Sequence, residues 1–126
     1  MYRLMRIHGD SMSPTLHAGE LVVVDEGSHH NDRPRLGDLV AVAPRACAGK
    51  RLVKRIAGVP GETVSVGEQR WKLNTDEYLL LGDRSHDSWD SRTFGPVTMT
   101  ELQGHVRLRL WPWTRWHHTT KGGWNR

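Results

Sequence analysis

The chain has 126 residues, of which 37% are hydrophobic, so it is large enough for one domain with a real core and too short for two. Its formal net charge is +4, but the basic residues are scattered among acids, which favours a soluble mixed surface over a nucleic-acid or membrane interface. The single cysteine, Cys47, excludes an internal disulfide and a thiolate metal cage.

Glycine and proline punctuate the chain at 13 and 6 positions, which leaves little room for long helices. Apolar and β-branched runs predict short strands at 2–8, 21–24, 39–43, 51–57, 63–66, 71–73, 78–81 and 105–111. Polar loops are expected between them at 25–35, 44–49 and 82–96, with one helical turn at 100–102. The predicted fold class is mostly β, a compact coiled barrel with little helix.

Two regions differ in composition. We expect residues 1–111 to form the folded core and residues 112–126 to be a flexible tail rich in tryptophan. Tryptophan beside arginine suits peripheral contact with a membrane interface, and a cap over the barrel core is the alternative interpretation. The chain has no apolar run typical of a signal peptide or a membrane-spanning helix, so a cytoplasmic or peripheral location is expected.

A serine lies on a short loop near the N-terminus, in the segment Gly-Asp-Ser-Met-Ser-Pro-Thr-Leu at 9–16. A Gly-Asp pair precedes Ser11, and Pro14 confines the residue before it to extended backbone, so a helix is not expected here. A serine held in this way can present its hydroxyl to another molecule, although the same residues could form an ordinary turn.

Lys54 lies within the predicted strand 51–57, where alternation places it on one face with Leu52 and Ile56. That face should be buried, and burial lowers the pKa of a lysine by disfavouring the ammonium form. A neutral lysine can remove the proton from a serine hydroxyl. The alternative is a lysine at a strand edge whose alkyl stem reaches to water.

Other residue types were weighed as a base or as metal ligands. His8, His86 and His105 are possible bases, but the chain has no Gly-x-Ser-x-Gly elbow, which argues against a hydrolase triad. The adjacent histidine pairs at 29–30 and 117–118 lack the spacing of a zinc site. No metal and no cofactor is expected.

Three segments together resemble the type I signal peptidase family. Residues 9–16 resemble its Ser-Met-x-Pro-Thr box, and residues 54–62, Lys-Arg-Ile-Ala-Gly-Val-Pro-Gly-Glu, resemble its Lys-Arg-x-x-Gly-x-Pro-Gly-Asp box. Residues 82–97 resemble the third, whose core is Gly-Asp…Ser-x-Asp-Ser-Arg-x-x-Gly. The three segments occur in the family's order and span most of 9–97.

The resemblance implies a serine endopeptidase with a Ser/Lys dyad on a mostly-β scaffold. Ser11 matches the nucleophile and Lys54 the general base. Ser88 matches the serine that orients the base, and Asp90 and Arg92 match a pair that shapes the site from behind.

The family also implies an oxyanion hole, to which the backbone N–H of Ser11 would contribute one donor. Gly9 stands where some members carry a serine whose hydroxyl is the second donor, so that donor is unassigned here. Members usually have an N-terminal membrane anchor, and larger ones insert a second β-domain where this chain has only 62–77. The sequence is therefore interpreted as a stripped catalytic core.

The implied activity is removal of an N-terminal leader or signal peptide from a precursor protein, with the substrate bound as an added strand. Small members that mature nickel-type superoxide dismutase are a precedent. One rival is a self-cleaving repressor-type domain with the same dyad, although only ten residues precede Ser11. The other is a non-enzymatic basic β-barrel that binds nucleic acid, which would leave the three segments unexplained; no nucleic-acid partner is expected.

Overall fold

The computed structural model of the chain describes residues 1–84 and 89–111, and the expected tail at 112–126 lies outside them. Its nine strands in this part of the chain are β1 (Tyr2–Arg6), β2 (Leu21–Glu26), β3 (Leu39–Val42), β4 (Leu52–Gly58), β5 (Thr63–Val66), β6 (Gln69–Lys72), β7 (Glu77–Leu81), β8 (Val97–Thr98) and β9 (Leu102–Trp111). The helical segments are single turns: α1 (Ser28–Asn31), α2 (Ser91–Phe94), and 3-10 turns at Arg45–Cys47 and Met99–Glu101. The prediction of a mostly-β fold with little helix is confirmed.

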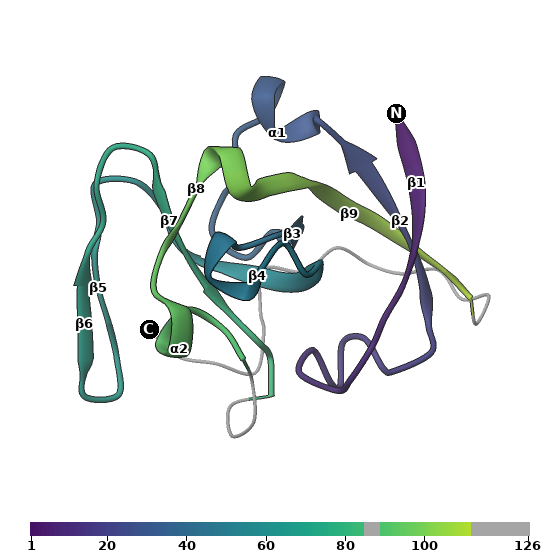
Figure 1. Cartoon of the computed structure of the whole chain (residues 1–126), viewed down its shortest axis with the longest axis horizontal. Coiled ribbons are helices and arrows are strands. Elements are labelled where there is room, and N and C mark those ends of the chain that lie inside the picture. The colour runs from purple at the N-terminus through teal and green to yellow at the C-terminus, as the bar shows by residue number, and fades with distance from the viewer. Residues whose placement is uncertain (85–88, 112–126) are drawn as a thin grey trace.

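Seven strands form one antiparallel sheet in the order β1-β2-β9-β3-β4-β7-β8, and β5 and β6 form a separate hairpin. Figure 1 shows this hairpin at one side of the molecule, away from β1. Strand β9, the last in the chain, pairs with both β2 and β3 in the middle of the sheet. Within the described residues the hydrogen-bonded ladder ends at β1 and at β8, so it does not join into a closed ring.

The core consists of three apolar clusters, and β4 contributes a buried residue to each of them. Val53 belongs to the first, Ile56 to the second and Ala57 to the third. Because these residues lie on both faces of β4, both faces are buried, whereas the sequence pattern indicated burial of one. The strand consequently carries two cations into the interior, since Lys54 is 2% and Arg55 0% exposed.

The loop that follows β1 is anchored in the first of these clusters. Met12 and Leu16 are 2% and 0% exposed, and they pack with Val22 and Val53. The backbone from 11 to 16 is a series of turns, in agreement with the expectation that no helix forms there. Burial of these two residues, which follow the serine, anchors the loop that presents it.

The described helices are all short. Two of them, α1 and α2, fall in segments that the sequence pattern assigned to loops, and the helical turn predicted at 100–102 is found at Met99–Glu101. No helix in the described ranges has the length and apolar content needed to cross a membrane.

Candidate active site

Ser11 and Lys54 meet at the wall of a cleft. Lys54 Nζ lies 2.9 Å from Ser11 Oγ and donates a hydrogen bond to it, although the two residues are 43 positions apart in the chain. The cleft has a volume of about 220 Å³ and is lined by residues of the segments 5–9, 11–12 and 50–54. In the neutral amine the donor and acceptor roles reverse, so this geometry suits proton transfer from the hydroxyl to Lys54.

The surroundings of Lys54 favour that neutral amine. Burial lowers the pKa of Lys54 to about 8 by removing water from the ammonium form. The nearby Asp90 carboxylate acts in the opposite direction, and the Arg92 guanidinium beside it lowers the pKa further. At pH 7 about a tenth of Lys54 is therefore the free base, whereas an exposed lysine is almost wholly protonated there.

The serine loop is held to the rest of the molecule by polar contacts. Thr15 Oγ1 donates to Asp83 Oδ2 at 2.6 Å, and the backbone N–H of Arg84 donates to the carbonyl of Ser11 at 2.8 Å. Arg84 also forms an ion pair with Asp10, the residue that precedes the serine. Contacts on both sides of Ser11 thus restrict where its hydroxyl can lie.

Asp83 in turn pairs with the buried Arg55. Two parallel hydrogen bonds join them, from Nε to Oδ1 at 2.8 Å and from Nη2 to Oδ2 at 2.7 Å, and a third runs from Arg55 Nη1 to the carbonyl of Gly37 at 2.8 Å. The sequence interpretation missed this pair. The available signal was that Arg55 alternates with Val53 and Ala57, because a cation between two buried apolar residues requires a buried carboxylate.

The predicted pair of Asp90 and Arg92 is joined by hydrogen bonds, and both charges act on Lys54. Arg92 donates from Nε to Asp90 Oδ1 at 3.0 Å and from Nη2 to Oδ2 at 2.7 Å. The Asp90 carboxylate also accepts from the backbone N–H of Arg92 at 3.0 Å and of Gly82 at 2.9 Å, so it caps α2 and holds the end of β7. Ser88 lies outside the described residues, so its role remains a prediction.

Gly9 lines the cleft beside Ser11. Its φ of +74° lies in the left-handed region that favours glycine, although an added Cβ would meet nothing within 4 Å. There is space for a side chain here, but the backbone does not favour one. The second oxyanion donor therefore stays unassigned.

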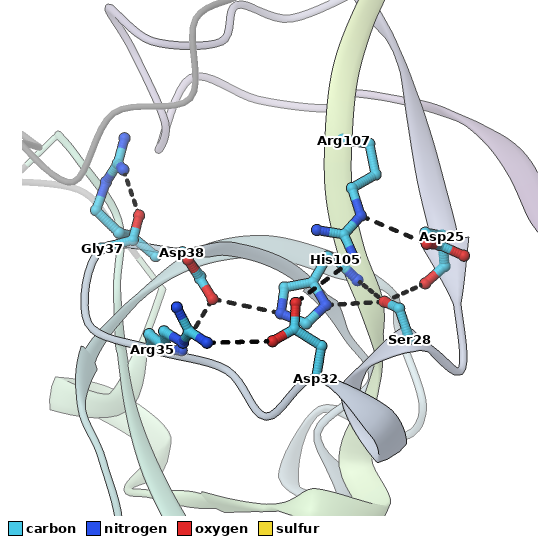
Figure 2. A network of polar contacts seen from close by, with 9 residues as sticks. Asp25, Ser28, Asp32, Arg35, Gly37, Asp38, His105 and Arg107 are labelled. Atoms are coloured by element: carbon cyan, nitrogen blue, oxygen red, sulfur yellow. Dashed lines mark hydrogen bonds and ion pairs between the residues drawn. The ribbon is translucent and has the colours of Figure 1, made fainter.

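The histidines considered as alternative bases lie in different places. His8 is exposed at the cleft, and His86 is outside the described residues. His105 is buried in a separate polar cluster, where Nδ1 lies 2.8 Å from Ser28 Oγ and Nε2 lies 3.3 Å from Asp38 Oδ2 (Figure 2). Its polar contacts are thus with residues other than Ser11.

The cluster of Ser28, His105 and Asp38 has the composition of a hydrolase triad, but the contacts of its serine argue against that role. Ser28 Oγ donates to the carbonyl of Asp25 at 2.6 Å and accepts from the backbone N–H of His105 at 3.1 Å. Figure 2 shows the hydroxyl held between Asp25 and His105. These bonds make Ser28 a structural link between α1 and β9, because its proton is already committed to a carbonyl.

The described residues contain no group of three His, Cys, Asp or Glu side chains suited to a metal ion. The chemistry available in the cleft is that of a hydroxyl beside an amine.

Comparison with known proteins gives a consistent result. The chain matches the family described as signal peptidase, peptidase S26, over residues 1–74 and 66–111. It is 33% identical over 114 residues to the mitochondrial ATP-independent inner membrane protease subunit 1b of Arabidopsis thaliana, covering 83% of this chain and 68% of that protein. It is 32% identical over 122 residues to the mitochondrial inner membrane protease subunit 1 of Schizosaccharomyces pombe, covering 92% and 78%. With signal peptidase I of Leptolyngbya laminosa the identity is 29% over 139 residues, covering 86% and 68%.

Proposed function

Since the chain belongs to the signal peptidase family, peptidase S26, we propose that this serine-type peptidase removes an N-terminal leader from a precursor protein with Ser11 and Lys54 as its dyad. One observation carries the assignment of the dyad. It is the 2.9 Å hydrogen bond between the buried Lys54 amine and the Ser11 hydroxyl at the cleft wall.

The proposed reaction is acyl transfer. Neutral Lys54 accepts the proton of Ser11 while Oγ forms a bond to the scissile carbonyl carbon. When the tetrahedral intermediate collapses, the peptide C–N bond breaks and Lys54 gives that proton to the leaving amine. A water molecule then attacks the ester carbonyl with Lys54 again as base, which releases the acid product and restores the serine hydroxyl.

Support for the dyad comes from the groups around it. Thr15 and Arg84 hold the serine loop, while the paired charges of Asp90 and Arg92 act on the lysine. In this proposal the backbone N–H of Ser11 stabilises the oxyanion, and Ser88 orients the Lys54 amine.

The proposed substrate is an extended peptide that lies in the cleft between residues 5–9 and 50–54. Met5, Ile7 and Leu52 supply an apolar lining that suits small or apolar side chains next to the scissile bond. The precursor of a nickel-type superoxide dismutase is one candidate substrate. Peripheral membrane contact through residues 112–126 is part of the same proposal, and it rests on the tryptophan content of that segment.

The test is cleavage of a leader-bearing precursor, followed by mass spectrometry of the products. Ser11→Ala and Lys54→Ala are each expected to reduce kcat by about 10³-fold or more, because each removes one half of the reacting pair. Ser13→Ala is the matched control, since it removes a hydroxyl from the same loop that contacts His17 rather than Lys54. Retention of cleavage by the Lys54→Ala variant would show that another group is the base.

A further inference from the structure

The residues that line the cleft carry charge of one sign. Arg6, Lys50 and Arg51 contribute to its walls, and none of the described residues that line it is acidic. The dyad itself needs one neutral lysine and no further cation, so this charge is not explained by the proposed reaction.

The charges of Arg6 and Lys50 are not compensated nearby. Arg6 donates from Nη1 to the carbonyl of Gly19 at 2.7 Å, a contact that orients the guanidinium and leaves its charge in place. Lys50 is exposed, and within the described part of the chain neither residue pairs with a carboxylate. Arg51 is different, because its Nη2 lies 3.9 Å from Glu26.

The carboxylates closest to the dyad are engaged elsewhere. Asp10 pairs with Arg84 at the surface, and Asp83 pairs with Arg55 in the interior. Asp90 is likewise paired with Arg92. A peptide that enters the cleft therefore meets a positive potential, and the partly enclosed walls weaken its screening by water.

We propose that this cleft selects extended peptides that carry a carboxylate side chain within a few residues of the scissile bond, and that it disfavours peptides with lysine or arginine there. The apolar lining near Ser11 accepts the residues that flank the cut, while Arg6 and Lys50 attract the acid. This inference rests on the proposed peptidase function, because the occupant of the cleft is taken to be the substrate.

The experiment uses peptides that differ at one position. Each set has glutamate, glutamine or lysine at one of the four positions on either side of the scissile bond. Affinity for the Ser11→Ala protein is measured by fluorescence anisotropy, and cleavage by the wild-type protein is measured in parallel. In at least one set, glutamate is expected to bind about fivefold tighter than glutamine and lysine more weakly than both. The difference should shrink at about 0.5 M salt, because ions screen exposed charges.

Substitution of Lys50 assigns the effect to the cleft. Lys50→Gln in the Ser11→Ala background should weaken the preference for glutamate, and Lys50→Glu, whose new carboxylate offsets the charge of Arg6, should abolish it. Lys72→Gln is the matched control, because it removes one exposed lysine from β6 and should leave the preference intact. Equal affinities within every set, or a preference that survives Lys50→Glu, would overturn the proposal.

The two proposals can fail separately. If the wild-type protein cleaves none of the peptides while the Ser11→Ala protein still prefers glutamate, the peptidase assignment fails and the charge preference stands. If all three peptides of every set are bound and cleaved equally well, the charge preference fails and the peptidase assignment stands.

Discussion

Lys54 combines a chemical advantage with an energetic cost, and both come from its burial. The low pKa of about 8 makes the neutral base available, but at lower pH the fold must accommodate an ammonium group that is 2% exposed. Two predictions at the scale of single residues follow from these opposite effects.

The first prediction concerns activity against pH. Because the neutral amine is the reactive form in the proposed mechanism, kcat/KM should rise with pH through about 8 and level off above it. It is measured on a peptide without ionisable side chains from pH 6 to 10, with circular dichroism at each pH to show that the protein stays folded. A profile that is flat across this range would contradict a role for Lys54 as base.

The second prediction concerns stability. Folding lowers the pKa of Lys54 from 10.5 to about 8, so between these values the unfolded chain binds more protons and wild-type stability rises with pH. Lys54→Met removes the buried ammonium, and at pH 6 it should raise the free energy of unfolding by roughly 2 kcal/mol. Urea unfolding at pH 6 and pH 10 checks this, since the advantage of the variant should shrink at the higher pH. A variant that is less stable at pH 6 would mean that the hydrogen bond to Ser11 outweighs the cost of burial.

At the scale of elements, β4 connects the dyad to the packing of the core. Lys54 points from it toward Ser11, and Arg55 points to the opposite face and reaches Asp83 and Gly37. Since Asp83 also accepts from Thr15, a single strand positions both Lys54 and the loop that carries Ser11.

The third prediction tests this link. Asp83→Asn leaves the charge of Arg55 buried without a counter-ion and should lower the free energy of unfolding by about 3–5 kcal/mol. Asp10→Asn is the control, because it breaks an ion pair between half-exposed side chains and should cost no more than about 1 kcal/mol. Chemical denaturation of both variants measures the difference. Similar losses in the two variants would show that burial of the Arg55 pair adds little.

The burial of residues within single strands could be predicted from the sequence in β4 but not in β9. The alternation of Leu52, Lys54 and Ile56 placed the lysine on a buried face, which the structure has. Within the predicted strand 105–111, Val106 and Leu108 alternate as two residues on one face of a regular strand do, yet Val106 is 2% and Leu108 41% exposed. Register shifts between β2 and β9 form β-bulges that interrupt the alternation of buried and exposed residues. The residues around a bulge have no sequence pattern that predicts it.

At the scale of the whole molecule, the strand order was beyond the reach of the sequence pattern. Strand boundaries depend on neighbouring residues, but the insertion of β9 between β2 and β3 depends on pairings between distant segments. The three motif segments, in contrast, could be recognised from the sequence, because each is a run of neighbouring residues and does not depend on how the segments pack. Arg55 and Asp83 both lie in motif segments that could be recognised from the sequence. Their ion pair could not be predicted, because the two residues contact one another only in the folded protein.

The fourth prediction concerns the fit of β9 in the sheet. A Cβ added at Gly104 would lie 2.2 Å from the carbonyl oxygen of Asp25, so Gly104→Ala must push β2 and β9 apart. We expect it to destabilise the protein by more than about 2 kcal/mol and to lower activity together with stability. Gly67→Ala is the control, because its Cβ would meet nothing within 4 Å and only the backbone strain of about 1 kcal/mol remains. Thermal unfolding of both variants measures the difference in stability. Equal melting temperatures would contradict the close approach of Gly104 to the backbone of Asp25.

The position of β9 between β2 and β3 also has a consequence for folding during translation. Ser11 and Lys54 leave the ribosome early, but β2 and β3 lack their shared partner until residues 102–111 have been made. Pairings between such distant segments form late and slowly. A growing chain thus contains both Ser11 and Lys54 without the sheet that brings them together, and the proposed dyad should form only once β9 has been made.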